Sequence, residues 1–240
     1  MKTIPLAILV AVATISAASA DLVYDIDYEP PAYTNGQQIG GGNTRTISDS
    51  IPGFTSQALL LHDGGGISYY APQPYTTGLH SISWDFGVPV DQSSTEIIGM
   101  LLGSAHVDVT MSGSPSSYLI EYGPFPLGAP RQSVPFQIGQ VYSFHILLDL
   151  DSARYALYLN GNQLLDDAPL QFGSSSLDYV SFGQSQTLGL QAGLDNFRWE
   201  VIPEPISILL ILLGGSFLIS SSRRKHEQKL DAQQSPAPLR

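Results

Sequence analysis

The chain has 240 residues, no cysteine and a formal net charge of −11 at pH 7. Without cysteine, the protein cannot form disulfides, thiolate zinc sites or a cysteine nucleophile. Between residues 21 and 200 the charge is more one-sided, with eighteen Asp and Glu residues against four Arg and no Lys. This composition excludes nucleic-acid binding, because no basic stripe is available to neutralise phosphates.

The first twenty residues have the pattern of an export signal. Met1 and Lys2 form a positive n-region, and residues 4–15 form an apolar stretch. Ala18-Ser19-Ala20 is a small-x-small cleavage site, so residues 1–20 are predicted to be a signal peptide and the mature chain to begin at Asp21.

Residues 21–201 are predicted to form a single domain rich in β-strands. Short runs of alternating apolar and polar residues are separated by Gly, Pro, Ser and Asn, and no helical period is present. The clearest strands are expected at residues 79–88, 96–102, 106–111, 117–122, 141–149 and 193–201. Such spacing is typical of a two-layer antiparallel β-sandwich, and therefore of the all-β class.

The best-defined local motif is a hairpin within residues 141–165. The side chains expected on its inward face are Tyr142, Phe144, Ile146, Leu148, Tyr155, Leu157 and Leu159. Residues 149–153 are predicted to form the first turn, and Asn160-Gly161 is a strong signal for a type I′ turn. This hairpin resembles the laminin-G-like and concanavalin-A-like jelly rolls. The stretch 193–200 resembles their closing strand, which implies that Phe197, Trp199 and Val201 face the core.

The C-terminal region contains a sorting and anchoring pattern. Pro203, Glu204 and Pro205 precede the uncharged apolar stretch 206–222, which is followed by Arg223, Arg224 and Lys225 as a basic stop cluster. As a helix, this stretch would be about 25 Å long, close to the thickness of a bilayer core. The basic cluster favours a cytoplasmic end.

This order of features resembles the PEP-CTERM sorting signal of bacterial surface proteins. The resemblance implies recognition and processing by a membrane-embedded exosortase. It assigns residues 202–225 to a sorting and anchor segment with one transmembrane helix, and leaves 226–240 as a polar tail.

Carboxylates alternate near the mature N-terminus at Asp25, Asp27 and Glu29, which would place them on one face of an extended strand. Laminarinase-type glycoside hydrolases share the jelly roll and carry their two catalytic carboxylates in such alternation. Their motif begins with Glu and lies deep in the chain, and this sequence departs from both features. A solvated acidic face that discourages edge pairing is a further interpretation.

A third interpretation of the same residues is structural calcium. Jelly-roll carbohydrate-binding modules hold calcium where the first strand meets the last, and Asp27, Glu29 and Asp195 occupy those sequence positions. Their oxygen ligands suit calcium, which is the one cofactor that the sequence suggests.

The tyrosine- and proline-rich segment 68–78 offers Tyr69, Tyr70 and Tyr75 as candidate sugar contacts, since rings on rigid loops stack on sugars at low entropic cost. The same rings could equally pack beneath loops. No Gly-x-Ser-x-Gly elbow is present in residues 21–201, and the four histidines of this region lack metal-ligand spacing.

We therefore expect a non-enzymatic surface protein that is exported and either tethered to the membrane or processed by an exosortase. Its expected location is the cell envelope membrane, as a single-pass protein, or the extracellular surface after processing. The expected role is to bind or form part of an extracellular polysaccharide matrix. The alternative is a divergent glycan hydrolase or lyase that uses the N-terminal carboxylates.

Overall fold

The computed structural model describes residues 20–40, 44–89, 96–102, 107–114, 117–123, 131–170, 176–183 and 191–203. The predicted signal peptide up to residue 19 lies outside these ranges, as do Glu204, Pro205, the predicted anchor helix and the basic cluster. Within the described ranges, no helix has the length and hydrophobicity needed to span a bilayer. Residues Asp21–Ile202 form one compact unit.

Fourteen strands make up this unit where the structure describes it. They are β1 (Asp21–Ile26), β2 (Arg45–Ser48), β3 (Ala58–His62), β4 (Gly66–Tyr75), β5 (Leu79–Gly87), β6 (Glu96–Leu102), β7 (Asp108–Ser114), β8 (Ser117–Tyr122), β9 (Gln132–Pro135), β10 (Val141–Asp149), β11 (Arg154–Leu159), β12 (Asn162–Pro169), β13 (Leu177–Gly183) and β14 (Gln191–Ile202).

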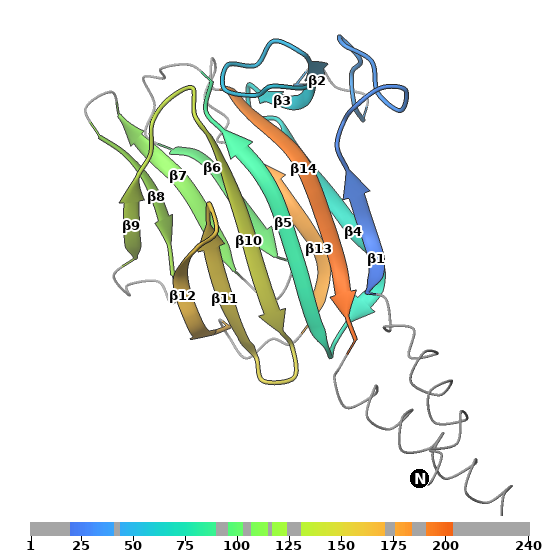
Figure 1. The fold of residues 1–240 in the computed structure, drawn as a ribbon, viewed down its shortest axis with the longest axis vertical. Coiled ribbons are helices and arrows are strands. Elements are labelled where there is room, and N and C mark those ends of the chain that lie inside the picture. Colours follow the sequence, from blue (N-terminus) through green and yellow to red (C-terminus); the bar gives the residue numbers. More distant parts are fainter. Residues whose placement is uncertain are drawn as a thin grey trace, which may run out of the picture. The chain divides into compact units, whose positions relative to one another are not determined.

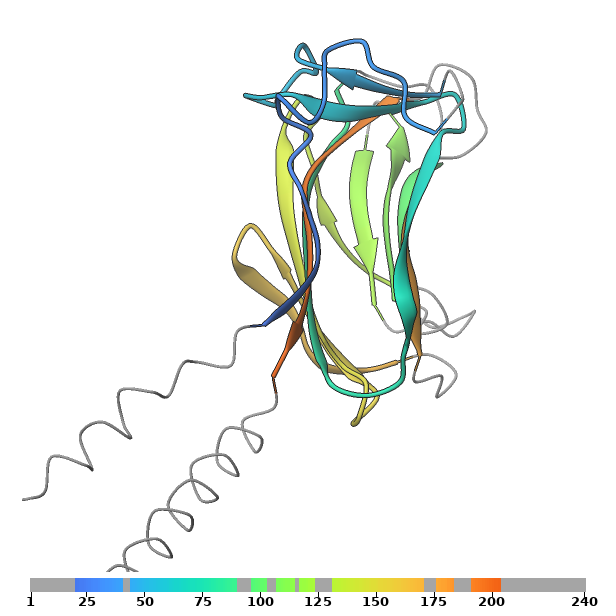
Figure 2. The same cartoon turned by 90° about the vertical axis from the view of Figure 1, so that its right-hand side faces the viewer.

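The strands form two antiparallel sheets that face each other (Figures 1 and 2). The eight-stranded sheet has the order β12-β11-β10-β5-β14-β3-β2, and β1 also pairs with β14. The six-stranded sheet has the order β4-β13-β6-β7-β8-β9. The predicted all-β sandwich is confirmed, and the expected strands at 96–102, 117–122 and 141–149 are β6, β8 and β10.

The core between the sheets is aromatic. Trp199 and Phe197 on β14 are fully buried. The rings of Trp84 on β5 and Phe144 on β10 stack with centroids 5.1 Å apart and an interplanar angle of 5°. Because these residues alternate with polar ones along their strands, the polar side chains are placed on the outer face of the eight-stranded sheet. Val201 pairs with the buried His80 of β5, so it shares the core-facing side of the sheet as the closing-strand resemblance implied, and it is partly buried.

The predicted hairpin is confirmed in detail. β10 pairs antiparallel with β11 from Phe144–Leu159 to Asp149–Arg154, and all seven side chains predicted to point inward are buried. Asn160 and Gly161 have φ angles of 49° and 77°, which the type I′ turn requires. The hairpin fixes the neighbours of every outward-facing residue on these two strands.

The segment 68–78 is not a loop, as the sequence suggested, because most of it belongs to β4. This strand is an edge of the six-stranded sheet, and β13 is its one partner among the strands that the structure describes. An edge strand tolerates Pro72 and Pro74, since a proline there removes no hydrogen bond from the sheet interior. Strand alternation then sends Tyr69 inward and Tyr70 outward.

Candidate functional site

A row of polar side chains crosses the outer face of the eight-stranded sheet. Each member pairs directly with the next across neighbouring strands. We call this set the polar row, and it consists of Tyr158 on β11, His145 on β10, Ser83 on β5, Arg198 on β14 and Asp25 on β1. With about 4.8 Å between strands, its four steps extend about 19 Å. The row therefore offers a continuous polar surface that is longer than one sugar ring.

Contacts within and beside the polar row hold its side chains in place. The His145 ring stacks on Tyr158 with centroids 5.5 Å apart. A hydrogen bond of 3.0 Å joins His145 Nε2 to Ser81 Oγ, one row further along the sheet. Arg198 Nη2 donates to Glu200 Oε1 at 2.6 Å. These contacts orient donors and acceptors before any ligand arrives.

His145 is the titratable group at the centre of the row. Partial burial lowers the pKa of its imidazole, while the nearby Glu200 carboxylate acts in the opposite direction. The ring is therefore neutral at pH 7, with one nitrogen as donor and the other as acceptor. Such a ring can contact a ligand hydroxyl without adding charge to the surface.

A shallow cavity of about 180 Å³ continues this face towards β12. Its lining residues are Leu147, Asp149, Ser152, Arg154, Tyr155, Ala156, Asp166 and Asp167. Figure 2 shows the β11–β12 hairpin curling away from the sandwich on this side. Arg154 Nη1 donates to Asp167 Oδ2 at 2.8 Å and to its carbonyl at 2.6 Å. Leu147 pairs with both Ala156 and Ser81, so the cavity and the polar row adjoin.

At the other end of the same strands, the outer face is covered. Gly87 on β5 pairs with Gly193 on β14, and the ring of Phe54 lies over both. A Cβ atom on Gly193 would come within 2.3 Å of Phe54 Cε2, so only glycine leaves room for the ring. The segment around Phe54 thus closes the end of the face.

Asp195 lies beneath this cover and is only 2% exposed. Burial raises the pKa of its carboxyl to about 7, and the neighbouring charges of Asp85 and Glu29 push it in the same direction. Hydrogen bonds from the Asn196 backbone N–H at 2.8 Å and from Ser56 Oγ at 3.3 Å oppose the shift. Desolvation outweighs these bonds, so a substantial fraction of Asp195 is protonated at neutral pH.

Of the three predicted calcium ligands, Glu29 and Asp195 lie near enough for the charge of Glu29 to raise the pKa of Asp195. Glu29 Oε1 is buried and has no hydrogen-bond partner. Asp27 is exposed, and its Oδ1 accepts the backbone N–H of Glu29 at 3.1 Å in a local turn. No three Asp, Glu, His or Cys side chains in the described ranges are grouped to hold a metal. Two carboxylates fit calcium only if hydroxyl or backbone oxygens complete the site, so calcium stays a prediction.

The alternating carboxylates do not share one face, contrary to the sequence-based prediction. Strand β1 ends at Ile26, and Tyr28 takes a φ of 54°. Its buried ring carries a hydroxyl that hydrogen-bonds to the hydroxyl of Tyr69. Burying Tyr28 in this way turns the chain, so that Asp25 alone remains in a strand.

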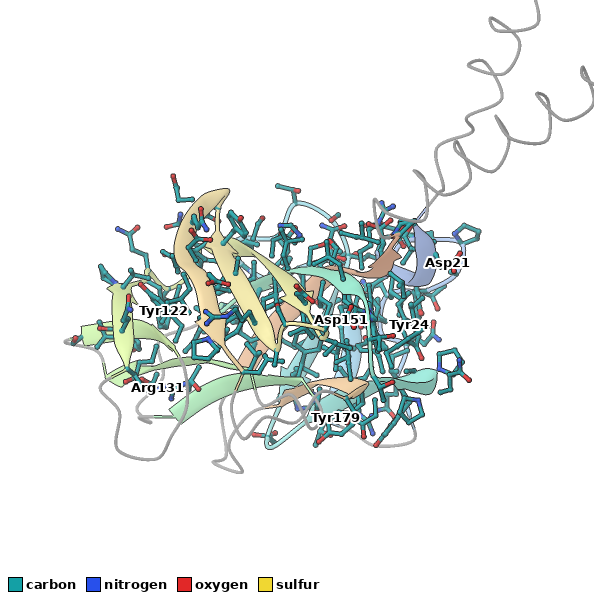
Figure 3. The ribbon with its side chains drawn as sticks, turned by 90° about the horizontal axis from the view of Figure 1, so that it is seen from below. Asp21, Tyr24, Tyr122, Arg131, Asp151 and Tyr179 are labelled. Carbon is teal, nitrogen blue, oxygen red and sulfur yellow. The ribbon has the colours of Figure 1, made fainter. Side chains whose placement is uncertain are left out.

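The three candidate sugar-contact tyrosines have different positions. Tyr69 is a core residue, 7% exposed and stacked on Phe197 at 4.4 Å, so its prediction as a sugar contact is wrong. Tyr75 is half-buried against His80 and Trp199. Tyr70 is 65% exposed, with its ring 5.6 Å from that of Tyr179. Figure 3 shows Tyr179 on the six-stranded sheet, across the sandwich from β10–β12.

The polar row was not among the sequence-based candidates, although part of its signal was visible. Ser81, Ser83 and Asp85 alternate with the apolar residues of β5, and His145 does the same on β10. Their mutual alignment depends on the order β11-β10-β5-β14, which the sequence does not reveal.

Comparisons with known proteins identify no family. Neither a family model nor a curated protein matches the sequence. Among solved structures, a sialidase has a TM-score of 0.51 at 10% identity, over 75% of this chain and 18% of that chain. Domain 4 of AbnA, an extracellular arabinanase from Geobacillus stearothermophilus in complex with arabinotriose, has a TM-score of 0.44 at 14% identity. It is matched over 80% of this chain and 98% of that chain.

The ligand-binding domain of botulinum neurotoxin serotype D, in complex with N-acetylneuraminic acid, has a TM-score of 0.45 at 11% identity. The match covers 84% of this chain and 47% of that chain, so this chain spans about half the length of that domain. At these identities the similarity concerns the fold alone. The likeness to the sialidase agrees with the two-layer all-β sandwich described above.

Proposed function

We propose that this chain is an exported surface protein whose sandwich binds an extracellular polysaccharide across the outer face of its eight-stranded sheet. The observation that carries the proposal is the polar row, in which five strands place donors and acceptors side by side over about 19 Å. A surface of this length suits an internal stretch of a glycan chain better than a single sugar.

The chemistry of the row matches a hydroxylated ligand. Glu200 keeps free lone pairs beside its bond to Arg198, so it can accept a hydrogen bond from a sugar hydroxyl. The ring of Tyr158 is held by His145, and a ring already fixed in place loses little entropy on binding. Binding, rather than catalysis, is the role that we assign to this face.

The places where the sandwich begins and ends are compatible with tethering. Asp21 pairs with Val201, so the predicted mature N-terminus and the exit towards Pro203 lie at the same end of the sandwich (Figure 1). Export and sorting themselves rest on the signal-peptide pattern and the PEP-CTERM resemblance.

Binding can be tested with the mature full-length protein in detergent, using affinity electrophoresis through gels that contain single polysaccharides. Tyr158→Ala and His145→Ala should each weaken retention about tenfold, which corresponds to about 1.4 kcal/mol. The matched control is Tyr70→Ala, because Tyr70 is an exposed tyrosine on the six-stranded sheet. This variant should bind the polysaccharide as tightly as the unmodified protein. If only Tyr70→Ala weakened retention, the glycan would bind on the six-stranded sheet, contrary to the proposal.

Sorting is tested separately in cells of the native host. Replacing Pro203, Glu204 and Pro205 together with alanine should leave full-length protein in the cytoplasmic membrane. Equal release of the triple variant and the unmodified protein would remove exosortase processing from the proposal. Such a result would leave glycan binding unaffected.

A further inference from the structure

The outer face of the eight-stranded sheet is acidic. Its outward carboxylates in and beside the polar row are Asp25, Asp85 and Glu200, and those of the adjoining cavity are Asp149, Asp166 and Asp167. The arginines of the same described surface are Arg154 and Arg198. Carboxylates therefore outnumber arginines on this face by six to two.

Both arginines are already neutralised by carboxylates. Arg198 donates to Glu200 at 2.6 Å, and Arg154 donates to Asp167 at 2.8 Å. His145 adds no charge, because burial lowers the pKa of its imidazole. Binding a ligand carboxylate or sulfate here would thus require breaking an ion pair or placing the anion among like charges.

The remaining polar groups are suited to hydroxyls. Asp85 accepts hydrogen bonds from Ser143 Oγ at 2.5 Å and from Asn196 Nδ2 at 2.8 Å, so it is fixed in orientation. Ser81 and His145 form a neutral pair at 3.0 Å. Fixed carboxylates and neutral donors can bind sugar hydroxyls without requiring any charge on the ligand.

We propose that this face selects uncharged glycans and rejects anionic ones, because every arginine on it is paired with a carboxylate. This inference rests on the proposed function, since it names the class of polysaccharide that the same face binds. Overall acidity would also repel anions, so the experiment must separate the local pairing from the net charge.

The test uses matched polymers that share a backbone and differ in charge. The probes are hydroxyethylcellulose against carboxymethylcellulose and dextran against dextran sulfate. The full-length protein in detergent should bind the neutral member of at least one pair, and its affinity for the anionic member should be at least tenfold lower at 20 mM salt. At 500 mM salt this difference should shrink, because the charges are then screened.

The decisive variant is Glu200→Gln with Asp167→Asn, which removes the carboxylate that is bonded to each arginine. It should gain at least tenfold in affinity for the anionic polymers at 20 mM salt. The control is Asp27→Asn with Asp49→Asn, which changes the net charge equally at two exposed positions outside the polar row and the cavity. The control should gain less than threefold.

Three results would overturn the inference. If the unmodified protein binds an anionic polymer as tightly as its neutral partner, the selection is absent although the proposed function holds. If both double variants gain equally, the net charge acts rather than the pairing. If the protein binds neither member of either pair, the proposed function fails for these backbones, and the inference fails with it.

Discussion

The two ends of the outer face of the eight-stranded sheet differ in exposure, although the same strands β5 and β14 build both. At one end, Phe54 covers Gly87 and Gly193, and Asp195 is 2% exposed. At the other end, Arg198 on the same strand has a side chain that is 49% exposed. Strand alternation decides the side of a sheet on which a residue lies, but a remote covering segment decides whether that side meets water.

Exposure sets the chemistry of each end. Burial raises the pKa of Asp195 to about 7, whereas Glu200, five residues later on β14, forms an ion pair with Arg198. The covered end therefore holds a carboxyl that is partly protonated at neutral pH. At the open end, Arg198 and Glu200 neutralise each other and remain partly exposed, so a ligand can reach them.

The largest expected difference between the two ends is in how stability depends on pH. This dependence comes from Asp195 at the covered end. Its pKa is about 7 in the folded state, against an ordinary value of 3.8. Between these values the folded state binds more protons than the unfolded state. Asp195 therefore favours folding at low pH, and this stabilisation is lost as the pH rises from about 4 to 7, by at most about 1.4 kcal/mol per unit.

Urea unfolding in chelator at pH 5, 6, 7 and 8 measures this effect. Asp195→Asn should be less sensitive to pH than the unmodified protein, and the difference in unfolding free energy between the two should grow from pH 5 to 7 and level off towards pH 8. Asp49→Asn, at an exposed position, should keep the original dependence. Parallel curves for the unmodified protein and Asp195→Asn would show that the Asp195 pKa is not raised.

Calcium offers the next largest effect at the covered end. If the ion binds Glu29 and Asp195, a hundredfold excess over Kd should stabilise the fold by about 2.7 kcal/mol. For a domain of this size, that corresponds to about 5–10 °C in Tm. Calcium should also hold Asp195 ionised and so remove its pH dependence.

The calcium prediction is checked by thermal unfolding with calcium, with chelator and with magnesium. Glu29→Gln should abolish the calcium increment, while Asp27→Asn, which alters only a local turn, should preserve it. If chelator did not change the Tm, or if magnesium restored it as well as calcium does, Glu29 and Asp195 would not form a calcium site.

A smaller effect should follow from disturbing the cover itself. Gly193→Ala places a methyl group 2.3 Å from Phe54 Cε2, so the ring must move, at a cost of about 1–3 kcal/mol. Gly183 on β13 has open space around its Cβ position, so Gly183→Ala should stay within about 0.5 kcal/mol. Equal stabilities of the two variants in urea would mean that Phe54 does not close the face.

The same contrast explains what the sequence could and could not reveal. The hairpin around Asn160-Gly161 was predictable because its turn chemistry and alternation are local. The inward position of Tyr69 was missed because Pro72 and Pro74 suggested a loop, whereas they lie on an edge strand. Burial of Asp195 depends on contacts such as that with Ser56, 139 residues away in sequence. The polar row likewise needs strand neighbours that no local pattern specifies.

The smallest expected effect concerns the stability contributed by the polar row. The side chains of the Arg198–Glu200 ion pair are 49% and 22% exposed, and pairs that meet solvent contribute about 0.2–1 kcal/mol. His145 is half-buried, and its bond to Ser81 can be replaced by water. His145→Gln should therefore change the free energy of unfolding by less than about 0.5 kcal/mol, while glycan retention weakens.

His80 is the matched control for His145, because it is a buried histidine on the core side of the same sheet. Its Nδ1 accepts the indole N–H of Trp199 at 3.3 Å, and its Nε2 donates to the Thr77 carbonyl at 3.2 Å. His80→Gln should lose about 1–3 kcal/mol, since it leaves buried polar groups without their partners. If the two histidine variants were equally destabilised in urea, the polar row would be part of the structural framework. A loss confined to His80→Gln would instead mean that the row contributes little to stability, so that a weaker glycan retention of His145→Gln could be assigned to binding.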